Sequence, residues 1–230
     1  MSEDAPLNQF CGTARLFPLP NLVLFPSVIQ PLHIFEPRYR QMTADALAAD
    51  RLIAIVLLRP GGEEDSEGRP AVQPVGCLGK IVADQRLDGG DYNLLLRGLR
   101  RVRLLGEVPT GRLYRTARVE LLHDAGGLGP EDAAALRQRL ADQLPRWVPA
   151  QAAALEQFRK LLDSDLAAGA LCDVFSFALP LDVPLKQQLL EELDVAERAR
   201  RLVAMLREHA PLAEPAGPHE RKFPPEFSAN

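Results

Sequence analysis

The fold of this chain is decided by the stretch Leu16-Phe17-Pro18-Leu19-Pro20-Asn21-Leu22-Val23-Leu24-Phe25-Pro26, continued by Pro31-Leu32-His33-Ile34-Phe35-Glu36-Pro37-Arg38-Tyr39. Apolar residues dominate both parts, and prolines interrupt them every few positions. Because proline has no backbone N–H to donate to a sheet ladder, strands here must be short, edge-like or bulged. The pattern is typical of a small irregular barrel rather than of a flat central sheet.

A helix and a buried strand follow this stretch. Pro37 occupies a position where a first-turn proline is tolerated, and the predicted helix ends near Asp50. Its apolar stripe has helical spacing and consists of Tyr39, Met42, Thr43, Ala46 and Leu47. The continuous apolar run from Leu52 to Leu58 predicts a strand that is buried on both faces.

The next segment predicts more strands. Val75 to Val82 and Tyr92 to Leu105 are joined around Asp88-Gly89-Gly90-Asp91, whose residues tolerate positive φ and therefore favour a hairpin. Gly98 inside the second strand indicates a bulge or a bend at a barrel corner. Leu113 to Leu122 predicts a further strand.

The glycine-rich segment 123–130 separates this strand-rich part from a helix-rich part. The predicted helices cover 131–144, ending before Pro145, then 150–162, 165–177, 184–193, and one that begins at Asp194. In the last helix, Asp194 as N-cap and Glu197 three residues later fit a capping box. We therefore expect a β domain with one helix over 1–123, a helical bundle over 124–210 and a disordered tail over 211–230.

The composition limits the partners and the cellular compartment that we expect for this chain. The net charge is −4 and the pI about 5.7, so the chain as a whole is not drawn to DNA or to an anionic membrane. Three separated cysteines, Cys11, Cys77 and Cys172, form no CxxC pair and predict neither a disulfide framework nor a zinc site. The acidic start carries no secretory signal pattern, and no uncharged apolar run is long enough to cross a bilayer. These features predict a cytoplasmic protein.

Catalytic motifs are missing from the sequence. The string nearest to a nucleotide-binding P-loop, Gly76-Cys77-Leu78-Gly79-Lys80-Ile81, has the wrong spacing and lacks the hydroxyl that reaches magnesium. No serine lies in a turn typical of a serine–lysine peptidase. His33, between Leu32 and Ile34, is interpreted as a structural histidine, and the other histidines are too scattered to form a metal site. We therefore predict no catalytic residue, no cofactor and no metal.

Three separated blocks together resemble the N-terminal substrate-recognition domain of Lon proteases. They are the opening stretch from Leu16 to Tyr39, the hairpin from Val75 to Arg101, and the run from Leu179 to Arg198, which contains Lys186-Gln187-Gln188-Leu189-Leu190-Glu191. The resemblance implies an α+β chain with a PUA-like β pseudo-barrel followed by an α-helical bundle. It also implies a module that helps to recognise unfolded or tagged substrates and is not the catalytic part.

Apolar and polar candidates for a binding surface lie in the opening stretch. Phe25 and Phe35 would contribute to a groove for unfolded peptide wherever they are exposed. Glu36 and Arg38 lie at the start of the first helix, where a carboxylate favours the positive end of the helix dipole. The alternative for this pair is a contact with a partner.

A basic region offers a second candidate surface. Between Arg86 and Arg118 there are eight arginines against three carboxylates, and Arg97, Arg101 and Arg103 are the candidate contacts. The alternation of Arg101 and Arg103 with apolar neighbours places both on one strand face. The alternatives are a solvated face, salt bridges to the helical bundle, or RNA contact, although few aromatic residues are present for base stacking.

The function predicted from the sequence is therefore binding without catalysis. The expected ligand is unfolded polypeptide or a partner protein, and the chain would supply or regulate a protease. The alternative is RNA binding through the basic strand face; no contact with DNA or with a membrane is expected.

Overall fold

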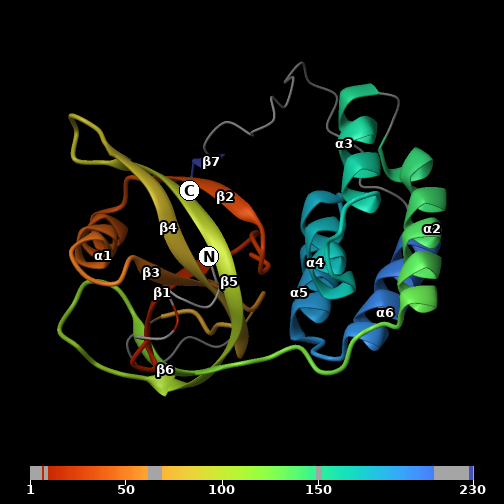
Figure 1. The fold of residues 1–230 in the computed structure, drawn as a ribbon. Helices are drawn as coiled ribbons and strands as arrows, with labels where there is room; N and C mark the ends of the chain where they lie inside the picture. The colour runs from red at the N-terminus through yellow and green to blue at the C-terminus, as the bar shows by residue number, and fades with distance from the viewer. Residues whose placement is uncertain (1–6, 8–9, 62–68, 149–151, 210–227, 230) are drawn as a thin grey trace. The chain divides into compact units, whose positions relative to one another are not determined.

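The computed structural model describes residues 7, 10–61, 69–148, 152–209 and 228–229. The chain divides into two compact units: residues 1–122 with 217–230, here called unit 1, and residues 123–216, here called unit 2. Unit 1 contains the sheet and unit 2 is helical, so the predicted α+β class is confirmed (Figure 1). The tail expected over 211–230 lies outside the described residues except for Ser228 and Ala229.

The sheet of unit 1 has the strand order β4-β3-β1-β6-β5-β2-β7, with an additional pairing of β4 with β5. Strands β1 and β3 are parallel, as are β2 and β7, and the other pairs are antiparallel. The strands are β1 (Thr13–Leu19), β2 (Ile29–Ile34), β3 (Leu52–Leu57), β4 (Val75–Arg86), β5 (Tyr92–Glu107), β6 (Thr116–Leu121) and β7 (Ser228–Ala229). The β4–β5 pairing closes β1, β3, β4, β5 and β6 into a barrel.

Strand β5 is the longest and organises the barrel. It pairs with β4 along one side, while its other side pairs first with β2 and then with β6. Figure 1 shows β4 and β5 as the long hairpin of unit 1. The closed barrel leaves β2 attached through β5, which makes β2 the outermost long strand of the sheet.

Proline is tolerated in a strand of this sheet where the strand is paired on one side only. Strand β1 pairs with β6 over residues 13–15 and with β3 over residues 16–19. Pro18 therefore has a partner strand on one side only, and its missing N–H leaves no gap in a second ladder. The predicted edge-like character of this strand is confirmed at Pro18.

The barrel core is apolar and its elements follow the predicted pattern. All six residues of β3 are buried, as the apolar run predicts. Helix α1 (Pro37–Leu47) begins at Pro37 and buries Tyr39, Met42, Thr43 and Ala46. The ring of Tyr39 lies 4.4 Å from that of Phe17, centroid to centroid, and joins α1 to β1.

The β4–β5 hairpin turns at Gly90, where φ is 84°, as the Asp-Gly-Gly-Asp sequence predicts. Strand β4 extends to Arg86, past the expected end at Val82, because its ladder with β5 resumes after a bulge. The predicted irregularity at Gly98 is confirmed, since the register shifts between Leu78 and Gly79, opposite it. A Cβ on Gly98 would lie 2.0 Å from the carbonyl oxygen of Phe25, which only glycine avoids.

Strand β6 begins at Thr116 rather than at Leu113. The residues before it bind helix α1 instead of joining the sheet: the Leu113 amide donates to Gln41 Oε1 at 2.9 Å. The Tyr114 hydroxyl donates to Asp45 Oδ2 at 2.8 Å. These tertiary contacts have no periodic signature in the sequence.

In its described residues, unit 2 has five helices: α2 (Pro130–Trp147), α3 (Ala152–Leu162), α4 (Ala168–Ala178), α5 (Val183–Glu191) and α6 (Val195–Glu208). Helix α2 passes through Pro145, so its predicted end before that proline is wrong. The last turn is held by Trp147, which is buried and donates from Nε1 to the carbonyl of Leu206 at 2.8 Å. No helix among the described residues is long and apolar enough to span a bilayer.

Helix α6 follows its predicted stripe, since Val195, Ala199, Leu202, Val203 and Leu206 are all buried. The predicted N-cap is also confirmed, because Asp194 Oδ1 accepts from the Glu197 amide at 2.9 Å. The reciprocal half of the capping box is wrong: the Asp194 amide donates to Glu192 Oε1 at 3.1 Å. The Glu197 side chain does not accept from the Asp194 amide; it forms ion pairs with Arg200 and Arg201 instead.

Candidate binding surfaces and a buried ion-pair cluster

Residues of three neighbouring strands share one face of the sheet in unit 1. Directly opposed residues of paired strands point to the same side, so the register defines three cross-strand rows. They are Ile29–Arg97–Lys80, Pro31–Leu95–Ala83 and His33–Asn93–Gln85, and together they are called the outer face. The middle row is wholly apolar and the first row carries two cations.

The alternating residues of these strands point the other way, into the barrel. Leu32, Leu94 and Leu96 are each at most 1% exposed. Ile29, in contrast, is 51% exposed, although its chemistry suits a core. The outer face therefore presents apolar side chains next to charged ones.

Two more exposed apolar residues lie close to these strands. Val82 is 47% exposed and is the additional residue of the β4 bulge between Ile81 and Ala83. Phe35 directly follows β2, is 41% exposed, and its ring stacks on His33 with the centroids 6.0 Å apart. Phe35 thus keeps its place as a candidate contact for an apolar ligand.

The prediction that Phe25 contributes to a surface is wrong. Its side chain is fully buried in unit 1. The segment between β1 and β2 runs close against β5, with the Ser27 amide donating to the Gly98 carbonyl at 2.9 Å. This close approach places Phe25 in the core, where it cannot contact a ligand.

Glu36 and Arg38 lie together at the start of α1, as predicted. Glu36 is the N-cap residue, but its side chain makes no capping hydrogen bond. Its Oε2 instead accepts from Arg38 Nε at 2.9 Å, and the Arg38 guanidinium lies 4.5 Å from the Tyr39 ring centroid. Both charges are thus partnered within the helix start, and a contact with a partner protein remains a proposal.

The basic candidates do not form one solvent-exposed row. Arg103 is exposed and donates to Glu120 Oε2 on β6 at 3.0 Å. Arg101 is only 2% exposed, so the expected solvent-facing pair of Arg101 and Arg103 is wrong. Arg101 lies in the middle of β5, paired with Cys77 of β4, where neighbouring parts of the fold cover it. Arg97 is half-buried in the first row of the outer face.

Other arginines of the basic region are bound to carboxylates of the same unit. Arg112 Nη1 lies 3.1 Å from Asp45 Oδ2 on α1. Arg115 pairs with Glu107 and also donates to the Pro70 carbonyl at 2.8 Å. Phosphate contacts at these positions would first have to break intramolecular ion pairs.

His33 has the hydrogen-bonded structural role expected for it. Its Nδ1 lies 2.8 Å from Asn93 Oδ1 across the β2–β5 ladder. Its Nε2 lies 3.8 Å from Asp91 Oδ2, and Asp91 also binds Arg40 at 3.3 Å. Within the described ranges, no cluster of three or more His, Cys, Asp or Glu side chains could hold a metal ion.

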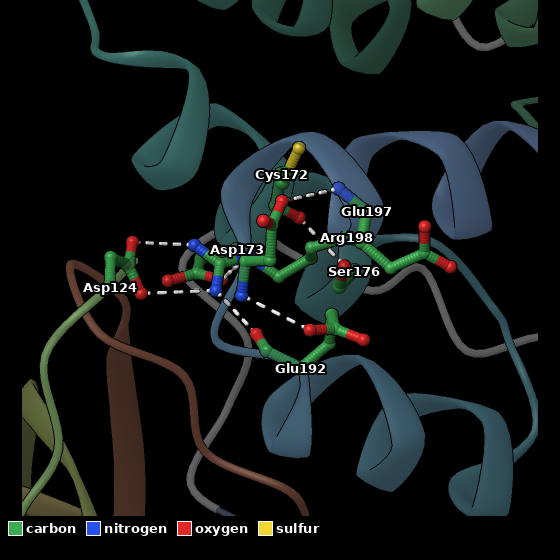
Figure 2. Close-up of polar contacts among 8 residues, drawn as sticks. Asp124, Cys172, Asp173, Ser176, Glu192, Glu197 and Arg198 are labelled. Carbon is green, nitrogen blue, oxygen red and sulfur yellow. Dashed lines mark hydrogen bonds and ion pairs between the residues drawn. The ribbon is translucent and has the colours of Figure 1, made fainter. Parts of the chain in front are cut away.

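Unit 2 contains a buried ion-pair cluster centred on Arg198 of α6, whose side chain is fully buried (Figure 2). Arg198 Nη1 and Nη2 donate to the two carboxylate oxygens of Asp124 at 3.0 and 2.5 Å. Nη1 also donates to the Glu192 carbonyl at 2.7 Å, and Nε lies 3.4 Å from Asp173 Oδ1. This planar, bidentate arrangement is specific for arginine.

Electrostatics keep Arg198 charged in this setting. Burial by itself lowers the pKa of its guanidinium, but the hydrogen bond to Asp124 and the negative charges of Asp173 and Asp124 raise the pKa above its usual value. The backbone adds to the attachment, because the Ala125 amide donates to the Leu193 carbonyl at 2.8 Å. The cluster therefore fixes the first residues of unit 2 to α6.

Sequence reasoning missed Arg198, although a signal existed. Arg198 lies three residues after Val195 and four before Leu202, which places it within the apolar stripe of α6. A charged residue inside an apolar stripe predicts a buried ion pair. Its partners Asp124 and Asp173 are far away in sequence, and only the tertiary fold identifies them.

Lys186 is a half-buried cation of unit 2. Its Nζ donates to the Phe177 carbonyl at 2.6 Å and lies 5.7 Å from the Phe177 ring centroid. Burial lowers its pKa to about 8. The Ser176 hydroxyl donates to the Cys172 carbonyl at 2.7 Å.

A closed barrel in one unit and a bundle of helices in the other are the fold of the Lon N-terminal class of domains. The family described as the ATP-dependent protease La (LON) substrate-binding domain matches residues 13–208. The chain belongs to this family. The matched domain is the non-catalytic, substrate-binding part.

Relatives and solved structures agree with this assignment. The chain is 32% identical over 218 residues to Lon protease 2 of Herpetosiphon aurantiacus, covering 90% of this chain and 26% of that protein. It is 26% identical over 207 residues to the Lon protease of Anaeromyxobacter dehalogenans, covering 89% and 23%. The chain thus spans about a quarter of the length of these relatives.

Two solved structures share the fold. A Lon N-terminal domain protein from Xanthomonas campestris superposes with a TM-score of 0.60 at 24% identity, covering 84% of this chain and 97% of that one. The N-terminal domain of a Mycobacterium avium complex Lon protease gives a TM-score of 0.63 at 21% identity, covering 86% and 99%. The predicted resemblance to the Lon N-terminal domain is therefore confirmed.

Proposed function

We propose that this chain binds extended or unfolded polypeptide, or a partner protein presenting such a segment, and that it supplies or regulates a protease. Membership of the substrate-binding family supports the binding role. The observation that carries the proposal is the exposed Ile29 on the outer face, next to the apolar middle row in which Ala83 is exposed, Leu95 is half-buried and Pro31 is buried. Unfolded chains differ from folded ones by their exposed apolar side chains, which such a row can contact.

The cations next to that row favour a polypeptide that also carries a negative charge. Arg97 and Lys80 belong to the row of Ile29, so the outer face is apolar in its middle row and basic in the first. A polypeptide that carries apolar residues followed by a carboxylate would satisfy both rows. Affinity would come mainly from apolar burial and therefore fall only modestly with salt.

RNA binding has weaker support as the alternative. Its three candidate contacts are a buried Arg101, a half-buried Arg97 and an Arg103 that is bound to Glu120. Release of counterions from RNA would make its binding fall steeply with salt. Salt dependence therefore separates the two functions.

The test is binding of the full chain to a permanently unfolded reporter polypeptide and to single-stranded RNA, each at low and at moderate salt. Ile29→Glu places a charge on the outer face and should weaken capture of the polypeptide by about tenfold, which corresponds to about 1.4 kcal/mol. Leu113→Glu is the matched control, because Leu113 is 66% exposed and lies before β6, outside the outer face. Equal capture by wild type and both variants would reject the outer face, and salt-sensitive binding of RNA alone would favour the alternative.

A further inference from the structure

Strand β2 has one edge that the barrel does not use. Its six residues, from Ile29 to Ile34, pair with β5 along their whole length. In the described part of the chain, the opposite edge is paired with β7 alone. An unpaired strand edge presents N–H and C=O groups that can accept a further extended strand.

The strand seated on that edge is a segment of the same chain from the other end of the sequence. Strand β7 runs parallel to β2 and pairs Ser228 with Leu32 and Ala229 with His33. Both strands belong to unit 1. The β2 edge is therefore able to hold an extended polypeptide segment in parallel orientation.

We infer that the β2 edge is the docking site for an extended polypeptide and that residues 228–229 occupy it in cis as a displaceable competitor. This inference rests on the proposed function and names its site. The occupant is held by backbone pairing over two residues of β2 only, and Ser228 and Ala229 are small. Pro31 has no N–H, and its carbonyl accepts from Gln30 Nε2 at 2.6 Å. A longer segment would therefore gain its further ladder bonds nearer the ends of β2, and these would let it replace residues 228–229.

Exposed side chains flank the paired positions and indicate which segments gain most. Ile29, His33 and Phe35 are separated by even numbers of residues, so in an extended strand they lie on one side of the sheet. Ile29 and Phe35 are both exposed, and Phe35 stacks on His33. An added strand with apolar side chains at alternate positions would meet them along its length, whereas Ser228 and Ala229 pair only with Leu32 and His33.

Because residues 228–229 belong to the same chain as β2, they can compete with a free peptide although they pair over only two residues. Strands β2 and β7 belong to the same chain, so their pairing is intramolecular, and such attachment corresponds to an effective concentration of roughly millimolar. A free peptide must compete with it. Releasing the internal strand should therefore raise the affinity for a free peptide without any change in the β2 edge.

The experiment uses the full chain with substitutions in β7. Ser228→Pro together with Ala229→Pro removes both N–H groups and prevents strand pairing. The matched control, Ser228→Ala with Ala229→Ser, keeps both N–H groups and the same composition. The probe is a fluorescent peptide with the sequence of residues 223–230, Phe-Pro-Pro-Glu-Phe-Ser-Ala-Asn, measured by anisotropy.

The double-proline variant should bind the probe at least about tenfold more tightly than wild type does, and the swapped control should equal wild type. A probe that is N-methylated at its Ser and Ala should not bind, because it cannot form the ladder. Hydrogen exchange over residues 29–34 should be faster in the double-proline variant and slow again when the probe is added.

Other outcomes would overturn the inference. Equal probe binding by all three chains, or unchanged exchange over 29–34, would show that residues 228–229 do not occupy the edge. A wild-type dimer that the double-proline variant abolishes would show that the segment pairs between copies rather than in cis. If the double-proline variant captures the unfolded reporter but not the probe, the proposed function stands and the β2 edge is rejected; if it captures neither, both fail.

Discussion

Arg198 and Asp124 form a two-point ion pair that joins the start of the helical unit to its last helix. The guanidinium is fully buried, whereas the Asp124 side chain is 36% exposed. The second carboxylate, Asp173, is only 2% exposed and lies on α4. The single positive charge of Arg198 is thus shared between one deeply buried and one partly exposed carboxylate from two separate segments.

Replacing Arg198 with Met should be strongly destabilising. The substitution leaves Asp173 as a buried charge without its cation, and breaking such a pair costs about 3–5 kcal/mol. Asp124→Asn should cost about 1 kcal/mol, because Asp124 is partly solvated and Arg198 keeps Asp173 and the Glu192 carbonyl.

Urea unfolding followed by tryptophan fluorescence measures these changes. Trp147 is the single tryptophan of the chain and is buried in unit 2 against α6, so it reports on the unit concerned. A loss of less than 1 kcal/mol in Arg198→Met would show that the cluster is not a determinant of stability.

Gly169→Ala should destabilise unit 2 although alanine favours helices. A Cβ at this position of α4 would lie 2.7 Å from Asp124 Oδ2 and 3.0 Å from Arg198 Nη2. Relief of that clash would pull the ion pair apart, at a cost of about 1–3 kcal/mol against a propensity gain of about 1 kcal/mol.

Gly127→Ala is the control, since its Cβ would meet no atom within 4 Å. The same fluorescence-detected unfolding should place this variant within about 0.5 kcal/mol of wild type. A Gly169→Ala variant as stable as wild type would mean that Asp124 can move away from Arg198 without loss.

Lys186 should make unit 2 more stable as the pH rises above neutrality. Its pKa in the folded chain is about 8, below the ordinary value of 10.5, because burial disfavours the charge. Between these values the unfolded chain binds a proton that the folded chain has released, so the free energy of unfolding rises with pH. Below about pH 8 both states carry the proton and the cost of burying the charge is present in full.

The measurement compares wild type with Lys186→Met at several pH values. The difference in unfolding free energy between the two should shift in favour of wild type by about 2 kcal/mol from about pH 7 to about pH 10. The comparison cancels the titration of tyrosines, which both chains share. A pH-independent difference would show that Lys186 reaches water in the folded state.

Much of the fold could be predicted because local patterns agreed with tertiary packing. The all-apolar run of β3, the first-turn Pro37 of α1, the stripe of α6 and the Asp194 cap each depend on residues close together in sequence. Gly98 lies at a register shift, as predicted, but the need for glycine there comes from the Phe25 carbonyl, which lies far back in the chain.

The errors arose where a distant contact overrode a local signal. Pro145 should end α2 by propensity, yet Trp147 binds the Leu206 carbonyl and stabilises the last turn. Leu113 and Tyr114 look like strand residues, yet Gln41 and Asp45 of α1 bind them.

The sequence by itself determined the class of the protein. Its proline-punctuated opening, its hairpin and its helical run resemble the Lon substrate-binding domain in residue type and order, and the family match over residues 13–208 agrees. Its strands and helices could be predicted because hydrophobic period, turns and caps act over a few residues. It also indicated that binding, rather than chemistry, is the role to test.

Only the tertiary structure decided which side chains are available for that role. Phe25 and Arg101 are candidates by residue type, but in the folded chain the side chain of Phe25 is fully buried and that of Arg101 nearly so. The same fold exposes Ile29, brings Ser228 beside Leu32 and places Arg198 against Asp124. Exposure and pairing depend on segments that are remote in sequence, and a chain shows their proximity only when it is folded.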